Sequence, residues 1–193
     1  LLDSQGIHAL TDYFNKMKNA AAQSGSSKAA KMIAEDISIR RAFAVAERLS
    51  KNEIEHPKLH ELKIILQKQF QNNPESRVIV FNHYRDSVSF VTTHINEVQG
   101  IRAARFIGQA TKSAKDKGLS QKNQIKVLQQ FREGEYNTLV ASAVAEEGLD
   151  IPSVDLVIFY EPAPSEIRLI QRRGRTGRKS AGRVIILMAE KTM

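Results

Sequence analysis

Residues 77–82 read Arg-Val-Ile-Val-Phe-Asn, and this short apolar run decides the fold. Apolar residues recur at helical spacing up to Asn73-Pro74, and the run follows shortly after this point. The run is apolar on both of its faces, which is typical of a central strand in a parallel sheet that helices cover on each side. The stretch therefore predicts the central strand of an α/β sheet.

Further apolar runs predict four more strands, at 101–107, 138–142, 154–160 and 183–188. The first of these is more polar than the others, so we expect it nearer an edge of the sheet. Strands that alternate with helices predict an open parallel sheet with helices on both faces. Ligands of such sheets gather at the carboxyl ends of the strands.

Helical spacing of apolar residues is found between these strands, over 84–97 and from Ser120 to Arg132. Ser120 is of the type that caps a helix N-terminus. The apolar positions of the second helix are Ile125, Leu128 and Phe131. Ser165 is expected to begin another helix, which leads into a stretch rich in arginine.

The N-terminal part of the chain has a different character. Helices are expected over 1–22 and 28–50, because apolar residues recur there every three or four positions. Between them, residues 24–27 read as a helix breaker and a cap. After a polar linker, Pro57 opens a helix that runs to about Phe70. We therefore expect a small all-helical segment, 1–54, followed by an α/β domain, 55–193.

Composition limits the class of protein. A chain of 193 residues with 41% hydrophobic residues can form one α/β domain and a small appendage. No apolar run approaches the roughly 20 residues of a membrane span, and no signal peptide is visible. The absence of cysteine excludes disulfides and cysteine-ligated zinc, and the five histidines lack metal-ligand spacing. Because the sequence opens with Leu1 and stops abruptly, we expect it to be part of a longer protein.

The net charge of +8 is unevenly distributed. Residues 1–56 hold eight Lys and Arg against seven Asp and Glu, whereas residues 57–193 hold 21 against 14. A basic excess confined to one part of a chain points to a polyanionic partner such as a nucleic acid. Solubility alone is the alternative explanation.

The sequence 171–178 reads Gln-Arg-Arg-Gly-Arg-Thr-Gly-Arg. From Arg168 to Arg183 there are seven basic residues and no acidic one. The planar guanidinium group fits pairs of phosphate oxygens, so the stretch suggests an anion-binding site. A solvated basic helix end is the alternative. Gly174 and Gly177 argue against it, because glycine weakens a helix but lets a ligand approach the backbone.

Two stretches together carry a resemblance. Glu147-Gly148-Leu149-Asp150-Ile151-Pro152, then a strand, then residues 171–178 resembles motifs V and VI of superfamily 2 helicases. This implies the second RecA-like domain of an ATP-dependent helicase. The segments 106–110, 118–124 and 131–142 are similar to those of the archaeal Hef helicase and the related Fanconi anaemia group M and Mph1 DNA helicases. That family remodels forked and branched DNA, and has a helical insertion between its lobes that residues 1–54 would match.

The resemblance assigns catalytic and ATP-binding roles. Arg175 and Arg178 would reach the γ-phosphate of an ATP held by another domain, and Gln171 would link the nucleotide to the nucleic-acid site. Gly148 and Asp150 would lie near the ATP ribose. An Asp in a turn before Ile151-Pro152 is the structural alternative for Asp150.

The resemblance also assigns nucleic-acid contacts. Ser142 stands where motif V usually has threonine, and either hydroxyl can bind a backbone phosphate. Residues 81–85 resemble motif IV, in which Arg85 would contact a phosphate. Gly108 and Gln109 begin a loop that carries Lys112 and further lysines, and flexible lysines bind phosphate without reading sequence. A plain surface loop is the alternative.

A helicase also needs a phosphate-binding loop of the form G-x-x-x-x-G-K-[ST] and an acidic magnesium motif. This chain has neither. ATP and Mg²⁺ would therefore be held mainly by a first RecA-like lobe of the same protein, and this part alone would be inactive. RIG-I-like RNA sensors and Dicer share the inserted-helix plan, so an RNA helicase stays open, as does a non-catalytic nucleic-acid-binding module. A nuclease domain elsewhere also stays open. We expect no membrane partner, and a location in the cytoplasm of an archaeon or the nucleus of a eukaryote.

Overall fold

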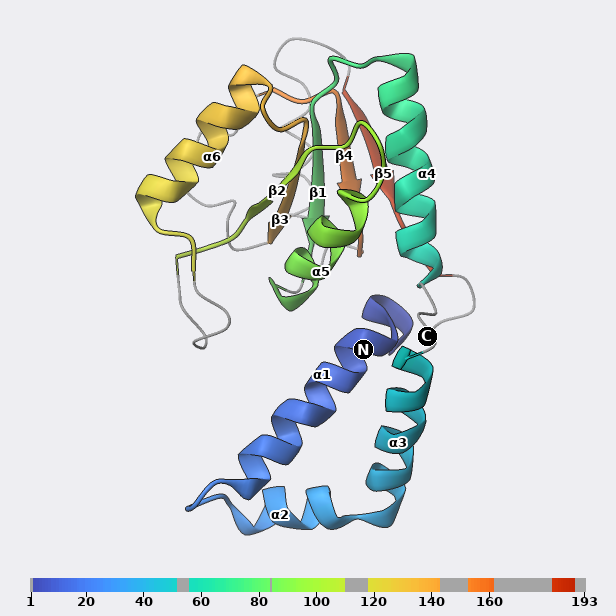
Figure 1. Ribbon diagram of the computed structural model, residues 1–193, viewed down its shortest axis with the longest axis vertical. Coiled ribbons are helices and arrows are strands. Elements are labelled where there is room, and N and C mark those ends of the chain that lie inside the picture. The colour runs from blue at the N-terminus through green and yellow to red at the C-terminus, as the bar shows by residue number, and fades with distance from the viewer. Residues whose placement is uncertain are drawn as a thin grey trace. The chain divides into compact units, whose positions relative to one another are not determined.

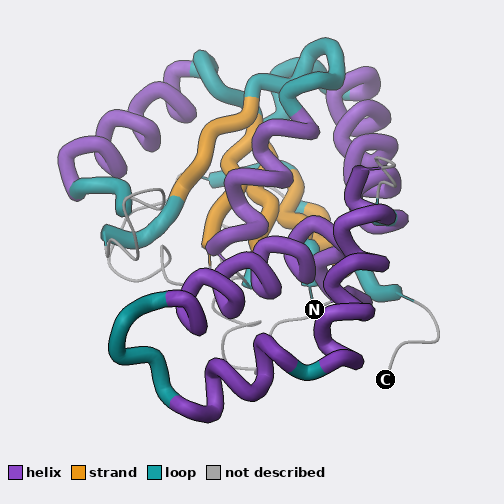
Figure 2. Tube along the Cα trace, turned by 60° about the horizontal axis from the view of Figure 1, so that its bottom comes forward, coloured by secondary structure: helices purple, strands orange, loops and turns teal. Residues whose placement is uncertain are grey.

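The computed structural model of the chain describes residues 2–51, 56–83, 85–109, 118–142, 153–161 and 182–189. The chain divides between Pro57 and Lys58 into two compact units, an N-terminal one and one of Lys58–Glu190. Among the described residues, strands occur only in the second unit, as the colours of Figure 2 show. No helix in these ranges is long and apolar enough to cross a membrane.

The N-terminal unit consists of the helices α1 (Leu2–Ala22), α2 (Lys28–Glu35) and α3 (Ile37–Lys51). Its small core includes an edge-to-face contact between Phe14 and Phe43, whose ring centroids are 5.6 Å apart. The helix α1 is kinked at Gly6, where φ is 82°. A side chain there would be strained, and its Cβ would come within 3.1 Å of the Cβ of His56.

The prediction of one continuous helix over 28–50 is wrong. Asp36 has an extended ψ of 129° and separates α2 from α3. Its Oδ1 accepts hydrogen bonds from the backbone N–H groups of Ser38 (2.8 Å) and Ile39 (3.1 Å), as an N-cap does. Of the apolar residues that recur at helical spacing in this stretch, Ile33 and Ile37 are exposed, whereas Ala46 is buried. The predicted cap at Ser27 is confirmed, since its Oγ accepts from the N–H of Ala30 at 3.2 Å.

The second unit contains a five-stranded parallel sheet with strand order β2-β3-β1-β4-β5 (Figure 1). The strands are β1 (Val78–Asn82), β2 (Ala103–Phe106), β3 (Thr138–Ser142), β4 (Leu156–Phe159) and β5 (Arg183–Ile186). All five predicted strands are confirmed, with the central place of β1 and the edge place of β2. A parallel sheet whose neighbouring strands are not consecutive in sequence needs crossover connections.

Helices cover both faces of the sheet, as the two-faced apolar pattern predicted. Val78 and Val80 of β1 pack on one face with apolar side chains of α4 (Pro57–Asn72) and α5 (Arg85–Ile95). Ile79 and Phe81 pack on the other face with α6 (Gln121–Glu133). Leu59, Leu62 and Leu66 of α4 are fully buried. Burial of each such leucine stabilises the fold by about 2 kcal/mol.

One expected core position in α6 is wrong. Ile125 is 54% exposed, whereas its polar neighbour Gln124 is buried. Gln124 is held there because its Nε2 donates a hydrogen bond to the carbonyl of Ile107, at 2.8 Å. A buried amide that finds such a partner can occupy a core position. The helical period places residue 124, rather than residue 125, on the same face as Leu128 and Phe131. The N-cap at Ser120 is confirmed, since its Oγ accepts from the N–H of Asn123 at 3.4 Å.

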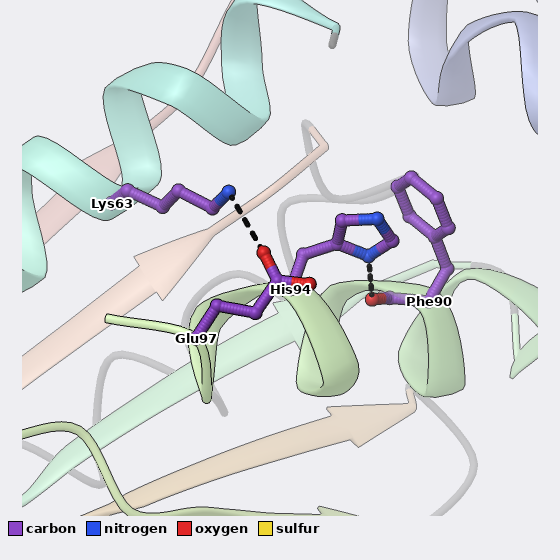
Figure 3. A network of polar contacts seen from close by, with 4 residues as sticks. All are labelled: Lys63, Phe90, His94 and Glu97. Atoms are coloured by element: carbon purple, nitrogen blue, oxygen red, sulfur yellow. Dashed lines mark hydrogen bonds and ion pairs between the residues drawn. The ribbon is translucent and has the colours of Figure 1, made fainter. Parts of the chain in front are cut away.

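An ion pair connects α4 to the segment just after α5, and a second polar contact lies within α5 itself (Figure 3). Lys63 Nζ of α4 lies 3.6 Å from Glu97 Oε2, and His94 Nδ1 lies 2.8 Å from the Phe90 carbonyl oxygen. An ion pair of this exposed kind contributes at most about 1 kcal/mol. It lies at the opposite end of α5 from Arg85, so it supports the packing of the two helices rather than the site described next.

Candidate nucleic-acid interface

The carboxyl edge of three neighbouring strands carries the described residues that the sequence assigned to nucleic acid. Ser142 is the last residue of β3, Arg85 is the first residue of α5, just past β1, and Gly108 and Gln109 follow β2. Because β2, β3 and β1 are adjacent in the sheet, these residues belong to one edge. Gln109 is exposed, and Arg85 and Gly108 are half-buried. Arg85 also opens a helix, whose first backbone N–H groups favour an anion.

Asn82 and Ser142 form the centre of this edge. They are paired residues in the β1–β3 ladder, and their side chains are 0% and 2% exposed. Among the described residues, neither the Asn82 amide nor the Ser142 hydroxyl has a hydrogen-bond partner. A buried polar atom without a partner costs about 1–3 kcal/mol. Two such side chains next to each other therefore lower the free energy of unfolding. Unpaired buried polar groups of this kind are typical of a binding site.

The amino edge of the same sheet is different. The buried Asn137 accepts from the Arg102 N–H at 2.8 Å and donates to the Gly100 carbonyl at 2.7 Å. Asp155 Oδ2 accepts from the Arg77 N–H at 2.7 Å. These side chains complete the turns that enter the strands, as structural polar groups do. The unpaired polar atoms of Asn82 and Ser142 are thus a property of the carboxyl edge and not of the sheet in general.

The base of the predicted lysine loop is fixed to this edge. The backbone N–H of Leu119 donates to the Gly108 carbonyl at 3.1 Å, which brings the two ends of the loop together. The Gln124 amide holds the preceding carbonyl, that of Ile107. Both ends of the loop therefore lie next to the carboxyl end of β2. Lys112, Lys115 and Lys117 lie outside the described residues.

A buried carboxylate stabilises the segment that follows β1. Glu161 Oε2 accepts a hydrogen bond from the backbone N–H of His83, at 2.7 Å. Glu161 is 5% exposed, and the nearby Lys58 of α4 is 6% exposed. Burial lowers the pKa of the Lys58 ammonium from its ordinary value, and the negative charge of Glu161 raises it in part. The two side chains are thus oppositely charged groups that share a poorly solvated environment.

Other predicted residues lie outside the described parts of the chain. They are Arg175, Arg178, Gln171, Gly148 and Asp150. In the described ranges, no group of three or more His, Asp or Glu side chains could hold a metal ion. The interface that can be described is therefore the nucleic-acid side of the predicted site.

Sequence reasoning missed four side chains that build this edge. Asn82 and Glu161 could have been suspected, because each is polar and directly follows a buried apolar run. Gln124 was missed because it is polar, although it lies four and seven residues before Leu128 and Phe131 and so shares their face of α6. Lys58 gave no signal, since a lysine in the first turn of an amphipathic helix is normally solvated.

Comparison with known proteins decides the family. Residues 57–180 match the family described as "Helicase conserved C-terminal domain". The chain belongs to this family. It is therefore a helicase C-terminal domain with the RecA-like fold, and domains of this kind are parts of ATP-dependent helicases.

The relatives of this helicase domain include archaeal and eukaryotic proteins. It is 43% identical over its whole length to MJ1505 of Methanocaldococcus jannaschii, named as a candidate ATP-dependent RNA helicase, and covers 23% of that protein. It is 41% identical over 160 residues to the mouse Fanconi anemia group M protein homolog, covering 77% of this chain and 8% of that one. These curated relatives are thus more than four times as long as the helicase domain described here.

A solved structure agrees with this assignment. The crystal structure of the Pyrococcus furiosus Hef helicase domain matches the whole chain at 45% identity, with a TM-score of 0.72, and the match covers 38% of that chain. The resemblance to the Hef, Fanconi anaemia group M and Mph1 helicases is therefore confirmed.

Proposed function

We propose that this helicase domain is the second RecA-like lobe of an ATP-dependent DNA helicase or translocase that acts on forked or branched DNA. In this proposal, the carboxyl edge of β2, β3 and β1 contacts the sugar-phosphate backbone. Ser142 and Arg85 bind phosphates directly, and the loop that begins at Gly108 and Gln109 adds Lys112. Such contacts hold a strand without reading its sequence.

The observation that carries this proposal is the polar pair at the centre of the carboxyl edge. Asn82 and Ser142 are buried in a sheet whose amino edge has its polar side chains paired. Arg85 and the base of a lysine-bearing loop flank this pair on adjacent strands. Hydroxyl, amide and guanidinium groups along one edge suit a chain of phosphates, and the net charge of +8 favours the same partner.

The proposal for ATP rests on the spacing of residues in the sequence. Arg175 and Arg178 would stabilise charge on the γ-phosphate of ATP, with Gln171 beside them and Gly148 and Asp150 near the ribose. Two guanidinium groups supplied across a domain cleft are suited to this task. ATP and Mg²⁺ would be held mainly by a first lobe of the same protein. Residues 1–54 would form a helical insertion between the two lobes.

The names of the relatives support a second candidate, a helicase that acts on RNA. The Mph1 protein of Aspergillus oryzae, 34% identical over 208 residues, is named a DNA helicase, whereas MJ1505 is named as a candidate RNA helicase. Phosphate contacts do not distinguish the two nucleic acids, because that distinction depends on the 2′-hydroxyl and on helix shape.

The test is ATP hydrolysis by the whole protein that contains this domain. Forked DNA is expected to stimulate the rate more than linear duplex DNA of equal length, and more than duplex RNA. Equal or greater stimulation by RNA would favour the second candidate. The 193-residue chain alone is expected to hydrolyse no ATP, because it lacks the phosphate-binding loop and the magnesium carboxylates. Substantial turnover by that chain would contradict the proposal of a separate first lobe.

A further inference from the structure

We propose that Glu161 is a positioning residue, whose buried carboxylate holds the backbone after β1 so that Arg85 is presented to the nucleic-acid strand. The inference rests on the proposed phosphate contact of Arg85. In this role Glu161 makes no contact with nucleic acid and instead acts through the main chain of His83. It also names Lys58 as the cation that allows the carboxylate to be buried.

The ladder between β1 and β4 ends with a side chain in place of a backbone acceptor. The last paired residues are Phe81 and Phe159, and the N–H of Tyr160 still donates to the Phe81 carbonyl at 2.9 Å. The next main-chain donor along β1 is the N–H of His83, and the Glu161 carboxylate accepts it at 2.7 Å. The side chain of Glu161 therefore replaces the next backbone acceptor and extends the pairing by one residue.

This hydrogen bond lies just before the helix that begins with Arg85. His83 lies two residues before Arg85, which begins α5. The position of the His83 amide therefore restricts where α5 begins. It also restricts the position of the Arg85 backbone, from which the guanidinium group extends. Glu161 is 78 residues away in sequence and lies two residues after the end of β4. The hydrogen bond thus ties the Arg85 segment to the adjacent strand of the sheet.

The acceptor of this hydrogen bond is a buried carboxylate. A neutral side chain could accept one N–H without burying a charge, and an unpaired buried carboxylate is strongly destabilising. Glu161 is nonetheless buried, with 5% of its surface exposed. Lys58 of α4 is buried to a similar degree. A hydrogen bond from a neutral N–H to a charged acceptor is shorter and stronger than one between neutral groups. A charged acceptor therefore fixes the backbone more firmly, and Lys58 offsets the cost of its charge.

The test compares two double variants of the 193-residue chain, Lys58→Met/Glu161→Leu and Lys58→Met/Glu161→Gln. Both remove the two charges, and replacement of a buried pair by apolar groups of similar size is often tolerated, so both are expected to fold. They differ in one respect, since only glutamine keeps an oxygen that can accept the His83 N–H. Any difference between them therefore reports on this hydrogen bond and not on general stability.

Two measurements are made on each variant. Amide hydrogen exchange by NMR reports on the His83 N–H, and the slope of log K against log [salt] for single-stranded DNA reports on the number of phosphates contacted. The His83 amide is expected to exchange at least about 10-fold faster in the Leu variant than in the Gln variant. Its salt slope should also fall by about 0.7, the value of one phosphate contact on a single strand. Adding Arg85→Gln to the Leu variant should change the slope no further.

Equal His83 exchange rates in the two variants would overturn the inference. Faster exchange in the Leu variant with an unchanged slope would overturn it too, provided that Arg85→Gln alone lowers the slope. If Arg85→Gln alone leaves the slope unchanged, the proposed phosphate contact fails, and the positioning role fails with it. In that case, the exchange rates still show whether Glu161 holds the segment, so the two failures can be distinguished.

Discussion

Asn82 and Ser142 face each other as paired residues of β1 and β3, and both side chains are buried. Their polar atoms have no hydrogen-bond partner among the described residues. The geometry of the sheet places them at its carboxyl edge, where open parallel sheets bind their ligands. The same two residues therefore connect the stability of the fold to the proposed binding of nucleic acid.

Asn82→Leu is expected to leave the free energy of unfolding unchanged or to raise it by about 1–2 kcal/mol, because leucine has the same branched shape and removes an unpaired buried amide. The matched control is Asn137→Leu at the amino edge. It leaves the N–H of Arg102 and the carbonyl of Gly100 without their partner, so it should cost about 2–4 kcal/mol. Urea unfolding of both variants measures the difference. Equal losses would contradict the assignment of Asn82 to a binding edge.

Ser142→Ala and Arg85→Gln are expected to weaken binding of single-stranded DNA in different ways. A hydroxyl donates one neutral hydrogen bond, so Ser142→Ala should lower the affinity at every salt concentration and leave the salt slope unchanged. Arg85 carries a charge, so its loss should reduce the slope by about 0.7. Fluorescence anisotropy between low and high salt measures both effects. Lys68→Gln removes a charge from an exposed position of α4 and is the control. An equal loss of slope in this control would show that net charge alone explains the effect.

Gly134→Ala is expected to destabilise the domain more than Gly100→Ala. Both glycines have a left-handed φ, 88° and 87°, so alanine is strained at each by about 1–2 kcal/mol. The space around them differs. A Cβ at Gly134 would come within 2.7 Å of the Arg77 guanidinium, whereas a Cβ at Gly100 would meet nothing within 4 Å. The Arg77 side chain is held by its hydrogen bond to the Phe131 carbonyl, so it cannot move freely. Equal melting temperatures for the two variants would contradict this account.

The strands could be predicted because their signal is local. The run at 77–82 is apolar on both faces, and the structure covers both with helices. The helices were predicted less completely, because side-chain hydrogen bonds decided the outcome at two places. Asp36 separates α2 from α3 by capping the N-terminus of α3. Gln124 is buried in the core, where Ile125 was expected.

The candidate site could be predicted in part. Ser142, Arg85 and Gly108 belong to motifs, and the strand order brings them to one edge. Glu161 and His83 are 78 residues apart, and no local pattern indicates that they meet. Lys58 owes its burial to the packing of α4, which composition and periodicity do not reveal. The side chains that support the candidate site depend on tertiary contacts, whereas those proposed to bind the ligand belong to local sequence motifs.

Lys58 is expected to make the free energy of unfolding depend on pH in the alkaline range. Burial holds the pKa of this lysine below its ordinary value of about 10.4. Between the two pKa values the unfolded chain binds more protons than the folded one, so the contribution of Lys58 to stability rises with pH. Below the folded pKa, its unfavourable contribution is constant.

The measurement is the unfolding free energy of the wild-type chain minus that of Lys58→Met, from pH 7 to pH 10.5. The difference should increase with pH, because groups that do not interact with Lys58 titrate alike in the two chains. Lys68→Met, on the exposed side of the same helix, corrects for the simple loss of a lysine. A difference that falls as the pH rises would mean that the attraction of Glu161 outweighs the burial of the ammonium.

Arg175→Ala and Arg178→Ala, made in the whole helicase, are expected to lower kcat for ATP hydrolysis by about 10³-fold or more, which is the effect of arginine fingers in phosphoryl transfer. Arg→Lys should restore little, because an ammonium cannot bind two phosphate oxygens as a planar guanidinium group does. Lys179→Ala removes a neighbouring charge from the same basic stretch and should have a small effect. Affinity for DNA without nucleotide should stay near that of the wild type. Near-normal ATP hydrolysis with lost DNA binding would instead assign residues 171–178 to the nucleic acid, and would leave the transferring phosphate to be stabilised by other groups.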